Sequence, residues 1–122
     1  MFSQFSDIDL QTKFDVIFTF SVLIHLEDNI AESCFEFVDN QLSSNGRFFA
    51  NVNIGNQRDG NWQGFPVVHR SLQFYEDLAA KNGLTLRILG KLIDLGHKSG
   101  SKSQDNKVML EVKKNNTVYN NV

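Results

Sequence analysis

The side chains of this chain that could carry chemistry are three histidines, one cysteine and 14 carboxylates. His25 ends an apolar run, and an imidazole can accept a proton from a substrate near neutral pH. The same ring could instead fix its own turn by a hydrogen bond to the backbone. His25 is the one candidate for a catalytic residue, and the catalytic residues otherwise stay unknown.

The common forms of metal and covalent chemistry are missing from the sequence. The histidines and carboxylates show no spacing such as H-x-x-x-H, so we expect no metal site. Cys34 is the only cysteine, which excludes an intramolecular disulfide and a site built from several thiolates. A serine nucleophile would need a G-x-S-x-G turn, and the chain contains none.

Composition limits the partners and the location that we expect. The chain has 12 Lys and Arg against 14 Asp and Glu, which gives no electrostatic reason to bind nucleic acid or an anionic membrane. The apolar stretch 16–26 is interrupted by polar residues and is too short to span a bilayer. The first ten residues lack the basic region of a secretory signal. Together with the single cysteine, this predicts a cytoplasmic protein.

The first half of the chain predicts a strand, a helix and a second strand. Residues 14–20 are β-branched and aromatic with apolar residues on both faces, which is typical of a strand covered on both sides. Asp28 is a plausible N-cap for a helix whose apolar residues recur at helical spacing, and Asn45-Gly46 predicts its left-handed end. Residues 47–54 form the next strand, which becomes polar at Asn51 and Asn53.

The second half predicts a long loop, a helix and a hairpin. Residues 55–70 hold the only tryptophan, Trp62, and the only proline, and such long irregular segments are usually functional. Ser71 caps a helix that Gly83 ends. Strands at 84–94 and 107–113 must be antiparallel, because the link between them is too short for a crossover. The order is therefore β-α-β-α-β-β in an α/β fold, with poorly ordered ends at 1–13 and 115–122.

Several motifs resemble one family. Residues 14–26 match a pattern F-D-x-I-x-x-x-x-V-L-x-H-L, and residues 42–49 resemble an L-x-x-G-G-R-F turn into a strand. Residues 62–66 and 71–75 resemble the segment before a last helix. In this order they resemble the fourth strand onward of class I S-adenosylmethionine-dependent methyltransferases, over about 100 residues from 14 to 113.

The resemblance implies a Rossmann-like half-sheet with strand order 4-5-7-6 and a last strand that is antiparallel, made by residues 14–114 as the C-terminal half of the domain. It implies S-adenosylmethionine as cofactor, with its methionine part beside Phe20, Ser21 and Val22, which end the first strand. His25 is the fourth candidate for cofactor binding. Residues 20–22 could also be only a strand end with a turn. The resemblance places the methyl acceptor, of unknown kind, beside a second set: Asn51, Asn53, Trp62, Phe65, His69 and Arg70. A loop aromatic such as Trp62 could instead anchor its own loop.

One feature of the family is missing. The chain has no G-x-G-x-G turn, through which the family's backbone approaches the cofactor. We therefore expect a truncated domain that binds S-adenosylmethionine weakly or not at all alone. The strand 14–20 would then have a bare edge, covered by a second copy or by an N-terminal half. The alternative is a non-enzymatic interaction module that associates through this edge.

Overall fold

The strand order is the feature that fixes this fold. A computed structural model of the chain describes residues 10–55, 58–96 and 107–115. Four of its strands form one sheet in the order β1-β2-β6-β5: β1 (Phe14–Thr19), β2 (Leu42–Val52), β6 (Val108–Lys114) and β5 (Leu84–Lys91). β1 and β2 are parallel, and β6 runs antiparallel to both of its neighbours. The predicted order 4-5-7-6 with a reversed last strand is confirmed.

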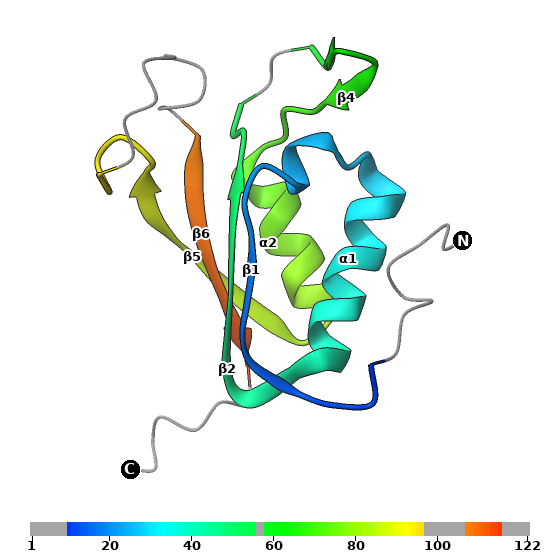
Figure 1. Ribbon diagram of the computed structural model, residues 1–122, viewed down its shortest axis with the longest axis vertical. Coiled ribbons are helices and arrows are strands. Elements are labelled where there is room, and N and C mark those ends of the chain that lie inside the picture. The colour runs from blue at the N-terminus through cyan, green and yellow to red at the C-terminus, as the bar shows by residue number, and fades with distance from the viewer. Residues whose placement is uncertain (1–9, 56–57, 97–106, 116–122) are drawn as a thin grey trace.

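Two helices cover one face of this sheet. Figure 1 shows α1 (Asp28–Gln41) and α2 (Leu72–Lys81) on the same side of the strands. Beneath them lies a core of apolar side chains in which alternate residues of β2, among them Phe48, Ala50 and Val52, are fully buried. Burial of such side chains supplies most of the favourable free energy of a small domain.

The opposite face of β1 is bare in the described residues, so the prediction that this strand is covered on both sides is wrong. Val16 and Phe18 are 62% and 56% exposed, and Phe14 and Phe20 on the same row are also exposed. The reason is that both described helices lie on the other side of the sheet. β1 is also the edge strand of the four-stranded sheet, so one side of its backbone ladder has no partner strand among the described residues.

The end of α1 differs from the prediction. The helix ends at Gln41, and β2 begins at once with Leu42. Gly46 therefore lies inside β2 and outside the left-handed region. Its missing side chain serves close packing, because a Cβ there would lie 2.9 Å from the carbonyl oxygen of Phe14 and 2.7 Å from Leu42 Cδ1. Residues 43–46 form an irregularity, since the pairing steps from Phe14–Leu42 to Val16–Arg47.

The predicted N-cap is correct for α2 and wrong for α1. Ser71 caps α2, and its Oγ accepts a hydrogen bond of 3.1 Å from the backbone N–H of Phe74. Asp28 does not cap α1. Glu27 occupies that position without a side-chain cap, and Asp28 is the first helical residue. The carboxylate of Asp28 is therefore available to another partner.

The region expected to be an irregular loop contains a hairpin. β3 (Gly60–Trp62) and β4 (Phe65–Val67) pair antiparallel, and Gln63 and Gly64 between them both have positive φ, as a tight two-residue turn requires. A short 3-10 helix, η2 (Leu23–His25), follows β1. Figure 1 shows the hairpin beyond the end of the sheet where η2 lies.

The remaining boundaries shift by a few residues. β5 ends at Lys91, and the predicted strand residues 92–94 belong to a turn. Gly83 has φ +71 just after α2, as expected for the residue that ends a helix. The predicted turn over 98–106 lies outside the described residues, as do most of the predicted ends 1–13 and 115–122. No helix among the described residues is long and apolar enough to cross a membrane.

Candidate functional site

The end of β1 and the end of β2 meet at one hydrogen bond. The backbone N–H of Ser21 donates to Asn51 Oδ1 over 2.6 Å, and Asn51 is fully buried. Ser21 has φ +58, so the chain turns in a strained, left-handed conformation directly after β1. The carboxyl edge of an open α/β sheet is where such folds bind ligands. The structure thus joins Ser21, predicted beside the cofactor, to Asn51, predicted beside the acceptor.

Two buried polar atoms at this edge have no hydrogen-bond partner among the described residues. They are Asn51 Nδ2 and Thr19 Oγ1. A buried polar group without a partner costs about 1–3 kcal/mol, and such groups are rare in folded proteins. Asn51, a predicted site residue, therefore has a buried side-chain N–H donor without an acceptor among the described residues.

His25 holds the hairpin to η2. Its Nδ1 lies 2.7 Å from the carbonyl oxygen of Pro66, and a carbonyl can only accept, so Nδ1 carries the proton. The neutral ring then has Nε2 as its acceptor nitrogen. A second bond runs beside it, from the backbone N–H of Val68 to the carbonyl of Ile24 over 2.8 Å. The predicted bond of His25 to backbone therefore exists, but it reaches a segment 41 residues away.

Trp62 and Phe65 face His25. The centroid of the His25 ring lies 6.2 Å from that of Trp62 and 6.0 Å from that of Phe65. The two aromatic residues are directly opposite each other in the register of β3 and β4. The structure therefore brings His25 together with Trp62 and Phe65, two predicted site residues that follow it by 37 and 40 positions in the sequence.

Asn53, just after β2, is hydrogen-bonded to residues 68–70, which follow the hairpin. Asn53 Nδ2 donates to the carbonyl of Val68 over 3.2 Å, and the backbone N–H of Arg70 donates to the carbonyl of Asn53 over 3.2 Å. His69 Nδ1 is buried without a hydrogen-bond partner among the described residues. These backbone bonds make Asn53 a positioning residue for the hairpin's base.

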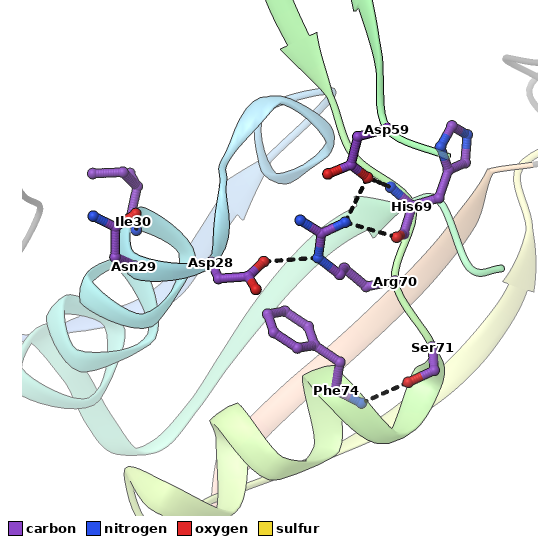
Figure 2. Close-up of polar contacts among 8 residues, drawn as sticks. All are labelled: Asp28, Asn29, Ile30, Asp59, His69, Arg70, Ser71 and Phe74. Carbon is purple, nitrogen blue, oxygen red and sulfur yellow. Dashed lines mark hydrogen bonds and ion pairs between the residues drawn. The ribbon is translucent and has the colours of Figure 1, made fainter. Parts of the chain in front are cut away.

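Arg70 is held by two carboxylates that were not predicted as site residues. Figure 2 shows its guanidinium between Asp28 at the start of α1 and Asp59 before β3. Its Nε lies 2.7 Å from Asp28 Oδ1, and its Nη1 lies 2.6 Å from Asp59 Oδ1. The guanidinium also lies over the ring of Phe74, 5.8 Å from its centroid. Arg70 thus ties the loop to both helices.

The contact between Arg70 and Asp59 shifts the pKa of both side chains. The hydrogen bond from Arg70, with that from the backbone N–H of His69, holds the pKa of Asp59 below its usual range. The hydrogen bond to Asp59 is also the main cause that raises the pKa of Arg70 above its already high ordinary value. Both groups stay charged at neutral pH, so neither is poised to exchange a proton there. No group of His, Cys, Asp and Glu side chains in the described part of the chain could hold a metal ion.

Sequence comparisons do not assign a family. No protein-family model matches the chain, and no curated protein matches it.

Solved structures do resemble it. A DhpI–SAH complex matches with TM-score 0.61 at 14% identity, over 90% of this chain and 52% of that one. The O-methyltransferase NcsB1 from neocarzinostatin biosynthesis, in complex with S-adenosyl-L-homocysteine (SAH) and 1,4-dihydroxy-2-naphthoic acid, matches with TM-score 0.62 at 17% identity, over 90% of this chain and 32% of that one. An S-adenosylmethionine-dependent methyltransferase from Clostridium acetobutylicum ATCC 824 matches with TM-score 0.60 at 13% identity, over 89% and 61%.

The chain therefore spans less than two thirds of the length of each of these proteins. At such low identity the likeness concerns the fold, and it agrees with the strand order and the reversed β6 described above. The chain has the fold of class I S-adenosylmethionine-dependent methyltransferases, over the part of that fold which it spans.

Proposed function

We propose that the chain is the C-terminal half of an S-adenosylmethionine-dependent methyltransferase domain and acts in the cytoplasm. The observation that carries the proposal is the sheet itself, in which parallel β1 and β2 are followed by a reversed β6 inserted beside β5. Several of the solved structures that share this fold are named as methyltransferases, and others are named as complexes with the cofactor or with SAH, which supports the proposal.

The residues after β1 could form one side of a cofactor site, but they do not supply the groups that would bind the ribose or let the backbone approach the cofactor. Ser21 turns the chain sharply at the strand end, between Phe20 and Val22, and its N–H is fixed by Asn51. Residues 20–22 contain no carboxylate to accept hydrogen bonds from ribose hydroxyls, and the 122 residues contain no G-x-G-x-G turn. We therefore expect S-adenosylmethionine to bind this chain weakly or not at all unless an N-terminal half completes the site.

The chemistry asks little of the chain's own side chains. The cofactor, when bound, supplies a methyl group on a sulfonium, so orientation of the acceptor does most of the catalysis. In our proposal the hairpin and the ends of β1 and β2 line the acceptor side, through Asn51, Trp62 and Phe65, while Asn53, His69 and Arg70 position them. His25 is the candidate proton acceptor, because the bond from Nδ1 to Pro66 leaves Nε2 as an acceptor.

Calorimetric titration tests the cofactor half of the proposal. The 122-residue chain should show no binding of S-adenosylmethionine tighter than about 1 mM, which corresponds to roughly −4 kcal/mol. The coding sequence upstream of Met1 is then read, and an in-frame strand followed by G-x-G-x-G is expected. The joined chain should bind at micromolar concentration. Micromolar binding by the 122 residues alone, or none by the joined chain, would contradict the proposal.

The exposed row on β1 favours a second candidate, an interaction module without enzymatic activity. Val16 and Phe18 are more than half exposed on an edge strand, and exposed apolar edges promote pairing with another chain. Sedimentation velocity of Val16→Lys tests it, with Leu95→Lys as the control, since Leu95 is equally apolar and half exposed but lies in a turn. Association that Val16→Lys abolishes and Leu95→Lys preserves supports the module. A monomer at all concentrations counts against it.

A further inference from the structure

The hairpin carries two large aromatic side chains that lie outside the hydrophobic core and are exposed to solvent. Trp62 is 55% exposed and Phe65 is 57% exposed, although each could contribute strongly to burial. They are cross-strand partners, and the ring of His25 contacts both. Single exposed apolar residues are ordinary, but adjacent exposed rings around a shared imidazole make a surface suited to stacking. We call His25, Trp62 and Phe65 the aromatic cluster.

Four polar contacts hold the hairpin, and with it the aromatic cluster, in place. The hairpin turn is closed by Asn61 Oδ1, which accepts from the N–H of Gly64 over 2.9 Å. Its β4 strand is tied to η2 by the bonds from His25 to Pro66 and from Val68 to Ile24. Its base is closed by the Arg70–Asp59 pair.

A site that is ordered before binding loses less conformational entropy when a ligand arrives. The contacts described above order the two rings relative to His25 in the absence of a ligand, so this cost should be small here.

The chemistry of the aromatic cluster selects a ligand class. Flat aromatic rings stack on tryptophan and phenylalanine faces more favourably than saturated rings of equal size, because offset stacking adds to burial. The nearest charges along the hairpin, Asp59 and Arg70, are paired with each other. No described residue bonds to His25 Nε2, which can accept a hydrogen bond from a hydroxyl.

We propose that the aromatic cluster binds an uncharged, planar aromatic ring that bears a hydroxyl group. That this ring belongs to the methyl acceptor rests on the proposed function. Binding itself does not, because all three residues are present in the 122-residue chain and none of the contacts that hold them involves a cofactor.

The single tryptophan makes the test direct. Trp62 gives the only indole N–H signal in a ¹H–¹⁵N spectrum of the chain. The probes are 2-naphthol and its saturated counterpart trans-2-decalol, added without S-adenosylmethionine. We expect 2-naphthol to shift the Trp62 signal with saturation below about 1 mM, and decalol to bind at least about tenfold more weakly. Equal binding of both, or no shift with 2-naphthol up to its solubility, overturns the proposal.

Variants locate the site. Phe65→Leu keeps the indole signal and an apolar side chain, and it should weaken 2-naphthol binding about tenfold. Phe18→Leu is the matched control, since Phe18 has a similar exposed fraction but lies on β1, and its binding should equal that of the unmodified chain. Both residues are exposed, so circular dichroism should show unchanged folds. Equal loss in both variants, or loss in neither, places binding elsewhere and rejects the proposal.

Failure here is separable from failure of the proposed function. If 2-naphthol binds as expected and the completed domain does not bind S-adenosylmethionine, the aromatic site stands and the methyltransferase proposal falls. The reverse result removes the aromatic site alone.

Discussion

Arg70 Nη1 lies 2.6 Å from Asp59 Oδ1, and these two residues stand at opposite ends of the β3–β4 hairpin. The same guanidinium reaches Asp28 at the first turn of α1. One side chain therefore closes the base of the hairpin and fixes it to the helical layer (Figure 2). Because Trp62 and Phe65 lie on this hairpin, the geometry of the aromatic cluster depends on Arg70.

Replacement of Arg70 by methionine should loosen the hairpin without unfolding the sheet. Methionine keeps an apolar stem against Phe74 and removes both ion pairs. We expect amide hydrogen exchange of residues 60–68 to quicken by about tenfold or more, while exchange in β2 and β6 stays unchanged.

Lys81→Met is the control for that experiment. It removes an exposed ion pair with Glu32 between the two helices, far along the chain from the hairpin. Exposed pairs of this kind contribute about 0–1 kcal/mol, so exchange in the hairpin should not change. Equal exchange in the hairpin of Arg70→Met and of the unmodified chain would show that Arg70 does not hold it.

Acid should release the hairpin before the core unfolds. The pKa of Asp59 is held below its ordinary 3.8 by the hydrogen bonds from Arg70 and from the His69 N–H. A lowered folded-state pKa stabilises the hairpin above pH 3.8, and that contribution is lost as pH falls through the lowered value. The Trp62 indole signal should therefore show a step below about pH 4.

Asp59→Asn removes the titrating group and tests the assignment. In this variant the signal of Trp62 should already differ at neutral pH, and the step below pH 4 should disappear. A step of the same size in both proteins would assign the transition to other carboxylates.

The sheet could be predicted from the sequence because its signals are local. The β-branched and aromatic run at 14–20 and the alternation in 107–113 specify strands, and the short link before the last strand forces an antiparallel pair. The hairpin was missed for equally local reasons. Pro66 argues against a strand, and Gln63-Gly64 is a weaker turn signal than Asn-Gly. β4 tolerates Pro66 because its pairing within the hairpin is on one side only.

The residues of the candidate site could be predicted from the sequence, but the contacts between them could not. His25, Trp62 and Phe65 stand out by residue type, but the bond of His25 to Pro66 spans 41 residues. Asp28 and Asp59 gave no signal as partners of Arg70, since they lie 42 and 11 residues from it and only the folded chain brings them together. Asp28 even carried a misleading local signal, that of an N-cap.

Gly46 should not tolerate a side chain. A Cβ there would meet the backbone oxygen of Phe14 at 2.9 Å and Leu42 Cδ1 at 2.7 Å, so Gly46→Ala must push β1 away from β2. Overpacking of this kind costs about 1–3 kcal/mol in the free energy of unfolding. Gly60→Ala is the control, because nothing lies within 4 Å of a Cβ at that position. Urea denaturation should show a lower midpoint for Gly46→Ala alone, and equal midpoints would exclude the clash.

We expect ionisation of Tyr75 to lower the free energy of unfolding at alkaline pH. Tyr75 lies on the buried face of α2, and this burial raises the pKa of its hydroxyl from 10.0 to about 12, because the phenolate is poorly solvated there. The unfolded chain then loses its proton first, so the stabilisation present below pH 10 declines as pH rises towards 12, by roughly 1.4 kcal/mol per pH unit. Tyr75→Phe keeps the ring in the core and cannot ionise. Its free energy of unfolding, measured by urea at pH 8 and pH 11, should fall less than that of the unmodified chain. Parallel declines in the two proteins would assign the alkaline loss to other groups and place the Tyr75 hydroxyl in a solvated environment.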